Sequence, residues 1–117
     1  MSEDIIDLPE FLERVQDDKE LLLELLDIFS ADYLEKRKAL TDALAKKDFE
    51  QIKNIAHSLK GASGNISAKP IRAIFLTLEE KGKKGELTGI EQLLKDLDQR
   101  FLELTNHIPQ IKQKLSK

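Results

Sequence analysis

A single histidine on an otherwise charged helical face is the residue best placed to do chemistry. His57 lies in a segment whose apolar residues recur every three or four positions, as they do on one face of an α-helix. At about 100° per residue, His57 points about 170° away from the centre of that apolar face. Its own side of the helix also carries Lys53, Lys60, Gly61 and Gly64. We therefore expect an exposed imidazole flanked by two ammonium groups and two residues without side chains.

This combination favours phosphoryl transfer. A neutral imidazole is a good nucleophile near neutral pH, because the reference pKa of histidine is about 6.5. A phosphoryl group on a ring nitrogen would carry about two negative charges. Lys60 lies one helical turn from His57, so its ammonium could donate to the phosphoryl oxygens and stabilise their charge.

The two glycines indicate a close approach to the imidazole. A glycine inside a helix costs about 1 kcal/mol relative to alanine, so two glycines in one turn need a reason. Bare backbone would let another molecule come close to His57. For Gly64 a local reason is also available, because Gly64 and Asn65 both accept the left-handed conformation that ends many helices. That local reason explains Gly64 more readily than Gly61.

The whole sequence divides into five helical segments. Each shows apolar residues at helical spacing, with capping or turn residues at its ends. The segments cover residues 7–15, 17–44, 48–66, 67–82 and 88–115. Long helices joined by short connections pack antiparallel. We therefore predict an all-α fold, an up-down antiparallel four-helix bundle with a short N-terminal helix across it.

Capping, glycine and proline residues predict where the helices begin and end. Short polar side chains are expected to cap the N-termini, namely Asp7, Asp17-Asp18, Asp48, Ser67 and Thr88. Gly82-Lys83-Lys84-Gly85 is expected to form the turn after the fourth helix. Pro109 is expected to kink or interrupt the fifth helix, because proline removes one backbone hydrogen bond and clashes with the preceding turn.

Several charged residues stand outside these patterns. Lys36 and Arg37 interrupt the apolar stripe of the second segment, so we expect that helix to lean outward there or to pass beyond its neighbour. Glu79 and Glu80 are expected on a solvated helix face, with no sign of paired acid and base carboxylates.

Length and composition exclude several classes of protein. The 117 residues fit one domain, spanning residues 1–117, and the absence of cysteine excludes a disulfide scaffold and thiol catalysis. The net charge of −3 argues against nucleic-acid binding. No apolar run approaches the ~20 residues of a membrane helix, and Met1-Ser2-Glu3-Asp4 does not begin a signal sequence. We expect a cytoplasmic domain that does not insert into membranes.

The residues around His57 also resemble a known family. The stretch Ala56-His57-Ser58-Leu59-Lys60-Gly61-Ala62-Ser63-Gly64-Asn65 closely resembles the signature of histidine phosphotransfer (HPt) domains of multistep two-component relays. The likeness in size, helical bundle and motif position extends over essentially the whole chain. It implies that His57 is the phosphoacceptor, that Lys60 steadies the phosphoryl group, and that Gly61 leaves room for the partner's active-site loops. Ser67 departs from the family, whose members often carry glycine there, and this puts the local turn in doubt.

The resemblance implies a phosphorelay intermediate. The phosphoryl group would come from a receiver-domain aspartate and pass to another receiver. The partners would be response-regulator receiver domains, a hybrid sensor histidine kinase, or both, with Lys53, Lys60, Gly61 and Gly64 at the interface. The chain would be a phosphate carrier without an ATP-binding or autokinase site, and we expect a monomer because no second apolar face is left over. We expect no intrinsic cofactor or metal, and magnesium in the partner receiver, because the sequence has no carboxylate cluster beside His57.

Two other interpretations remain open. The chain could be a helical adaptor whose Lys53 and Lys60 face only docks an acidic partner. It could instead be the phosphoacceptor domain of a chemotaxis-type histidine kinase, phosphorylated by an ATP-binding domain of the same polypeptide. Either a free-standing protein or a domain of a larger hybrid kinase fits the sequence.

Overall fold

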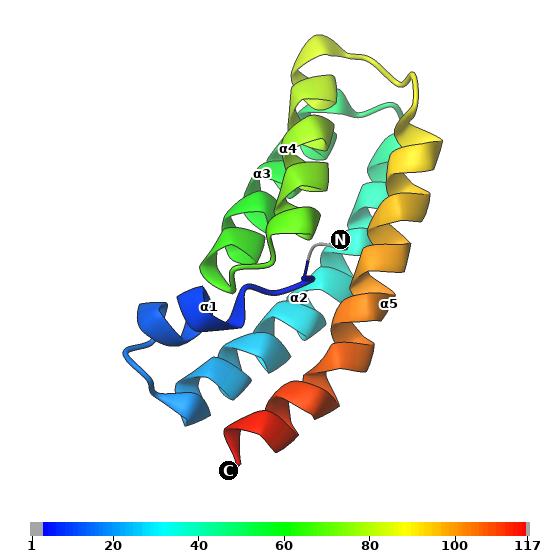
Figure 1. Cartoon of the computed structure of the whole chain (residues 1–117). Helices are drawn as coiled ribbons and strands as arrows, with labels where there is room; N and C mark the ends of the chain where they lie inside the picture. The colour runs from blue at the N-terminus through cyan, green and yellow to red at the C-terminus, as the bar shows by residue number, and fades with distance from the viewer. Residues whose placement is uncertain (1–3, 117) are drawn as a thin grey trace.

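Four long helices form an up-down antiparallel bundle, and a short helix lies across it (Figure 1). The computed structural model describes residues 4–116. The five helices are α1 (Leu8–Arg14), α2 (Lys19–Ala45), α3 (Phe49–Asn65), α4 (Lys69–Lys84) and α5 (Ile90–Leu115). The predicted fold class is therefore confirmed. The outermost parts of the predicted 1–117 domain, Met1–Glu3 and Lys117, lie outside the described residues.

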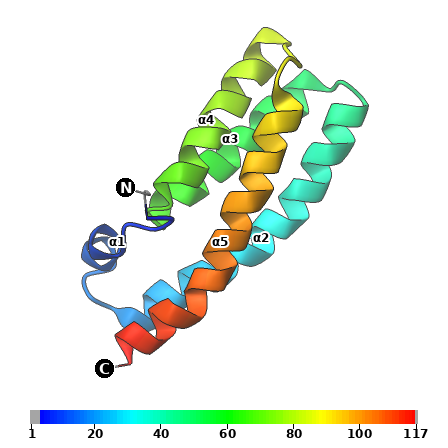
Figure 2. The same ribbon diagram turned by 45° about the vertical axis from the view of Figure 1, so that its right-hand side comes forward.

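The difference in helix length explains the position of α1. Helices α2 and α5 have 27 and 26 residues, whereas α3 and α4 have only 17 and 16. The longer pair extends past the connection between α3 and α4, and α1 lies beside the part of α2 left uncovered there (Figure 2). Phe11 of α1 is fully buried, so this helix contributes to the same core as the bundle.

One hydrophobic core runs along the bundle. Each long helix contributes fully buried side chains, among them Leu22, Leu40, Ile52, Leu59, Ile71, Phe75, Leu97 and Leu104. Tyr33 of α2 stacks on Phe101 of α5 with a ring-centroid distance of 3.8 Å and contacts Phe75 of α4 edge-on. Burial raises the pKa of the Tyr33 hydroxyl, so this ring remains neutral in the core. Of the helices in residues 4–116, none is both long enough and apolar enough to cross a membrane.

The aspartate caps were predicted correctly. Asp7, Asp18 and Asp48 each precede a helix, and each carboxylate accepts a hydrogen bond from the backbone N–H three residues later. The two hydroxyl caps were wrong. The residue before α4 is Ala68 and the residue before α5 is Gly89, and neither provides a side-chain cap.

Ser67 has another role. It lies in the connection between α3 and α4 with a left-handed φ of 56° and is 1% exposed. Helix α3 ends at Asn65, and the residue with the left-handed conformation after it is Ser67, not Gly64 or Asn65. Its hydroxyl donates to Glu10 of α1 at 2.8 Å, which explains why this side chain is not available to cap α4.

The structure differs from expectation at Gly82 and, in part, at Pro109. Gly82 lies inside α4, which continues to Lys84 and ends at the left-handed Gly85. Of the kink or interruption expected at Pro109, the interruption is absent, since α5 continues as one helix to Leu115. Leu104 and Ile111, which precede and follow the proline, are both buried and hold the two parts of α5 on the core.

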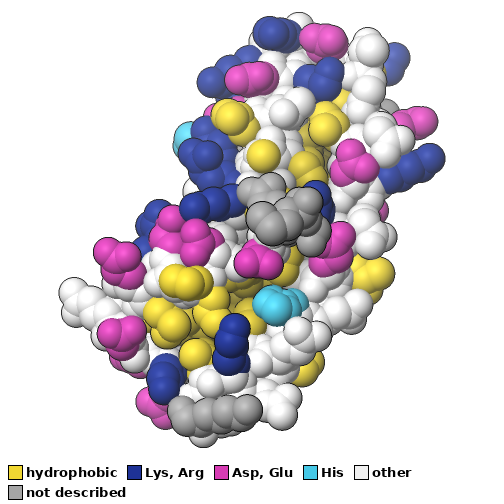
Figure 3. All heavy atoms as spheres, in the orientation of Figure 1, with side chains coloured by type: hydrophobic (Ala, Val, Ile, Leu, Met, Phe, Trp, Pro, Cys, Tyr) yellow, Lys and Arg dark blue, Asp and Glu magenta, His cyan; other side chains and the backbone are white. Residues whose placement is uncertain are grey.

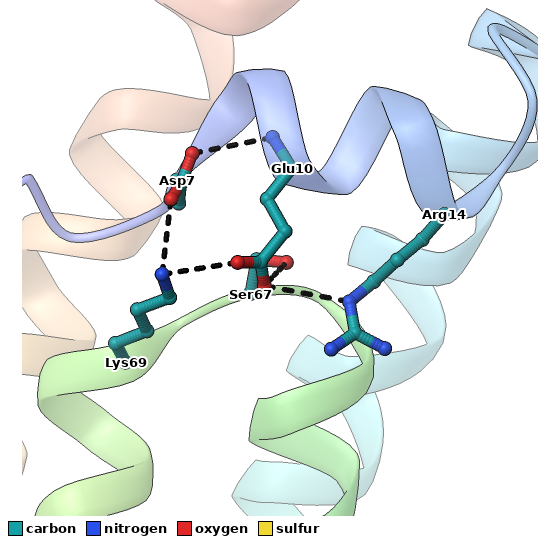
Figure 4. A network of polar contacts seen from close by, with 5 residues as sticks. All are labelled: Asp7, Glu10, Arg14, Ser67 and Lys69. Carbon is teal, nitrogen blue, oxygen red and sulfur yellow. Dashed lines mark hydrogen bonds and ion pairs between the residues drawn. The ribbon is translucent and has the colours of Figure 1, made fainter.

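A polar network, here called the α1 clasp, joins α1 to the α3–α4 connection (Figure 4). It consists of Asp7, Glu10, Arg14, Ser67 and Lys69. The Lys69 ammonium lies 3.1 Å from an Asp7 oxygen and 3.0 Å from a Glu10 oxygen, and the backbone N–H of Asp7 donates to the Ser67 carbonyl. The hydrogen bonds from Lys69 lower the pKa of both carboxyls, and the two carboxylates raise the pKa of Lys69. The charged forms therefore stabilise each other.

Candidate functional site

His57 is exposed on the outer face of α3. Its side chain is 70% exposed, whereas Ile52 and Leu59 of the same helix are fully buried. The helical wheel therefore predicted its orientation correctly. Figure 3 shows one face of the molecule, with Lys and Arg side chains gathered around α4 and a histidine at the edge of the view beside them.

A buried carboxylate on α4 holds both His57 and Lys60. Glu79 Oε2 lies 2.7 Å from His57 Nδ1, and Glu79 Oε1 lies 2.6 Å from Lys60 Nζ. The Glu79 side chain is only 6% exposed. The expectation of a solvated face for Glu79 was wrong, because this residue faces α3.

A helical wheel of α4 places Glu79 at the edge of the apolar stripe. The apolar stripe of α4 contains Ile71, Ile74, Phe75 and Leu78. At about 100° per residue, Glu79 lies about 90° from the centre of that stripe, whereas Glu80 lies about 170° away. A residue at the edge of a stripe can face a neighbouring helix. That angle was the available signal, but the sequence alone does not tell which neighbour Glu79 meets.

The Glu79 contact fixes the state of the imidazole. Hydrogen bonds from Lys60 and then from His57 lower the pKa of Glu79, so its carboxyl group is ionised. An ionised carboxylate only accepts hydrogen bonds, so Nδ1 of His57 must donate its N–H to Glu79. In the neutral ring the lone pair is then on Nε2. Glu79 therefore orients the ring and selects the tautomer whose Nε2 can act as a nucleophile.

The other predicted site residues lie along the same face of α3. Lys53 forms an exposed ion pair with Glu50 at 3.3 Å. A Cβ added to Gly61 would meet no atom within 4 Å, so this glycine is not required by packing inside the domain. A Cβ on Gly64 would lie 3.4 Å from the Arg72 side chain, an ordinary contact with a flexible group.

On the other side of His57, a lysine from α2 reaches α3. Lys36 Nζ lies 2.6 Å from Ser58 Oγ and 3.0 Å from Asp32 Oδ2. The neighbouring Arg37 forms an ion pair with Asp98 of α5 at 2.9 Å. The two charged residues that interrupt the apolar stripe of α2 thus reach the two helices beside it, and the helix does not have to lean away from the bundle.

The structure shows no cluster of metal-ligating side chains around His57 in the part of the chain that it describes. Within residues 4–116, no group of three or more His, Asp or Glu side chains converges in a way that could hold a metal ion. The one carboxylate in contact with His57 is Glu79, and both of its oxygens are engaged by His57 and Lys60.

Comparisons with known proteins agree with this geometry. The model of the Hpt domain family matches residues 24–114. The fold is similar to the crystal structure of histidine-containing phosphotransfer protein B (HptB) from Pseudomonas aeruginosa PAO1, with a TM-score of 0.86 and 26% sequence identity over 97% of this chain and 98% of that chain. Comparison with curated proteins gives no match.

The chain therefore belongs to the Hpt domain family. It is a histidine phosphotransfer domain, which serves as an intermediate in phosphorelays. Such a domain carries a phosphoryl group and is not a kinase.

Proposed function

We propose that His57 is the phosphoacceptor and that it exchanges its phosphoryl group with receiver-domain aspartates. The observation that carries this proposal is the contact between His57 Nδ1 and the buried, ionised Glu79. Because Nδ1 of this exposed histidine is held by Glu79, the ring has a fixed tautomer and its Nε2 remains free to react with a phosphoryl donor. A surface histidine without a chemical role would not need a buried carboxylate as its partner.

The transfer step follows from this tautomer. The lone pair of Nε2 attacks the phosphorus of an aspartyl phosphate in line with the leaving oxygen. A P–N bond forms, the P–O bond to the receiver breaks, and the receiver regains its carboxylate. Nδ1 keeps its proton, so the phosphorylated ring is a cation whose N–H faces Glu79. In the reverse step neutral imidazole leaves, which keeps the group transferable.

Lys60 and the glycines support this step. Lys60 brings one positive charge to the face where the phosphoryl group arrives, and Glu79 holds its ammonium in place at 2.6 Å. Open space around Gly61 admits the receiver's active-site loops. Lys53 and Gly64 extend the partner surface along α3 towards its two ends.

The remaining chemistry belongs to the partner. We place the magnesium ion in the receiver. The carboxylate beside His57 is that of Glu79, and its two oxygens are already engaged by His57 and Lys60. In this proposal the domain works as a monomer in the cytoplasm, without an ATP site of its own. Its interface with response-regulator receivers or a hybrid sensor kinase is modest and transient.

A phosphotransfer assay tests the assignment. A phosphorylated receiver with magnesium should label this chain with an acid-labile, alkali-stable phosphate, and His57→Gln should abolish the labelling while circular dichroism remains unchanged. His107→Gln is the matched control, since the chain has 2 histidines, and it should be labelled like the wild type. Labelling of His57→Gln would overturn the proposal. Repeating the assay with an isolated kinase catalytic domain and ATP distinguishes a kinase donor from a receiver donor.

A further inference from the structure

We propose that Lys36 of α2 is a docking residue for the receiver domain and contacts acidic groups of the receiver on the side of His57 opposite Lys60. This inference rests on the proposed function, in which His57 is the phosphoacceptor. It adds a second helix, α2, to a site that sequence reasoning confined to α3.

The first argument is the position of the Lys36 ammonium. Lys36 belongs to α2, but its Nζ lies 2.6 Å from Oγ of Ser58, the residue that follows His57 on α3. Ser58 is exposed, and the side chains of Lys36 and Asp32 are each 34% exposed. The charge therefore lies at the surface, beside the helical turn that carries the phosphoacceptor.

The second argument is the arrangement of cations around His57. Viewed along α3, Ser58 lies about 100° from His57 in one direction and Lys60 about 60° in the other. Lys36 is bound to Ser58 and Lys60 is bound to Glu79, so cations lie on both sides of the imidazole. A receiver that brings its aspartate to His57 covers both sides.

The third argument is that the Lys36 ammonium is held in place and still has an unused hydrogen-bond donor. An ammonium group has three N–H donors, and the contacts of Lys36 with Ser58 and Asp32 account for two of them. Asp32 and Ser58 also restrain the long side chain before any partner arrives. Docking to Lys36 would therefore cost less side-chain entropy than docking to an unrestrained lysine.

The ion pair with Asp32 does not by itself account for this lysine. The Lys36–Asp32 pair is an i,i+4 pair at the surface, and such pairs contribute little to folding. Lys36 also interrupts an apolar stripe that otherwise continues from Tyr33 to Leu40, both buried. Arg37, beside it, is engaged by Asp98. A positive charge at position 36 is instead suited to an acidic partner surface such as a receiver's phosphorylation site.

The experiment measures kcat and KM for transfer from a phosphorylated receiver to this chain at low and high salt. Lys36→Ala should raise KM by about threefold to tenfold with kcat unchanged, and the effect should shrink at high salt. Lys36→Arg should restore KM, because it keeps the charge. Lys38→Ala is the matched control, an exposed lysine about 200° further around α2, and should match the wild type.

The outcomes separate this inference from the proposed function. Phosphoramidate, a small phosphoryl donor, labels an accessible phosphoacceptor without a receiver. Absence of label at His57 of the wild type would overturn the proposed function. If phosphoramidate labels the wild type and Lys36→Ala equally, and the two proteins also have the same KM for transfer from the receiver, only the role of Lys36 is overturned. A lower kcat, or a loss of thermal stability that Lys36→Arg fails to rescue, would also contradict docking.

Discussion

Gly82 of α4 lies directly against the main chain of Lys53 in α3. A Cβ on this glycine would be 2.9 Å from the Lys53 nitrogen and 3.0 Å from its Cα, closer than packed atoms allow. Glu79 precedes Gly82 by three residues, and His57 follows Lys53 by four, on antiparallel helices. The close approach at Gly82 therefore sets the spacing across which Glu79 reaches His57.

Gly82→Ala should destabilise the domain in spite of the higher helix propensity of alanine. The methyl group would meet backbone atoms that cannot rotate away, so α3 and α4 must separate, at a cost of about 1–3 kcal/mol. Urea unfolding followed by circular dichroism measures the change. Unfolding at the wild-type urea concentration or above would show that the two helices separate without cost.

Gly61→Ala should do the opposite. No atom lies within 4 Å of the added Cβ, and replacing a helical glycine stabilises the folded state by up to about 1 kcal/mol. The larger Gly61→Gln should also fold, but transfer from a receiver should fall about tenfold or more, because the bulk displaces the partner. Phosphoramidate labelling should stay at the wild-type rate. A receiver reaction unaffected by glutamine would mean that no partner approaches this position.

Glu79→Gln should impair phosphotransfer without removing the nucleophile. A neutral amide no longer requires an N–H donor at Nδ1, so His57 loses its fixed tautomer and the phosphorylated ring loses its facing carboxylate. We expect the single-turnover rate to fall about tenfold or more. Nitrogen NMR of the imidazole should show Nδ1 protonated in the wild type and a tautomer mixture in the variant. Glu80→Gln, one residue away and exposed, should behave like the wild type.

The α1 clasp should depend on pH at both extremes. Lys69 lowers the pKa of Asp7 below its usual 3.8 and that of Glu10 below its usual 4.5, so the clasp is complete above pH 4.5 and is lost as the pH falls through these lowered values. The pKa of Lys69 is raised above its usual 10.5, so on the alkaline side the clasp is complete below 10.5 and is lost as the pH rises through the raised value.

Amide hydrogen exchange in α1 measures this dependence. Protection of α1 should decrease below the usual carboxyl range while protection in α3 and α5 persists. Lys69→Met should weaken the acid dependence in α1, because each carboxyl would lose its main partner and keep only the smaller effect of its other hydrogen bonds. Equal loss of protection in all helices would show that acid unfolds the whole bundle and not the clasp.

Variants of Ser67 should separate backbone strain from hydrogen bonding. Ser67→Ala keeps the left-handed φ of 56° but loses the hydrogen bond to Glu10, so it should destabilise the fold by about 1 kcal/mol. Ser67→Gly loses the same bond but adopts this φ without strain, a gain of about 1 kcal/mol. Chemical unfolding should therefore rank Ser67→Gly close to the wild type and above Ser67→Ala. The reverse order would indicate that the serine backbone is not strained.

The features that were predictable from the sequence are the local ones. Asp7, Asp18 and Asp48 cap their helices because each contacts a backbone group only three residues away. The exposure of His57 follows in the same way from the periodicity of a single helix.

What could not be predicted depends on contacts between helices. Glu79 meets His57 and Lys60 because of how α3 and α4 are rotated relative to each other, and no local pattern specifies that rotation. Ser67 is bound by Glu10 of α1, 57 positions away, so its tertiary contact outweighs its capping propensity. The close approach of Gly82 to Lys53 likewise required the packed bundle. The roles of His57 and Lys60 in transfer stay predictions until phosphotransfer is measured.

The aromatic stack between Tyr33 and Phe101 gives this domain a built-in optical probe. The chain has 1 tyrosine and no tryptophan, and that tyrosine is buried where α2 meets α5. Its tyrosine emission and the tyrosine band of its near-ultraviolet spectrum consequently come from one place in the molecule. Loosening of the α2–α5 contact can be followed by tyrosine emission or by the tyrosine band in near-ultraviolet dichroism with no added dye, while helix α3, which carries His57, remains unlabelled and unaltered.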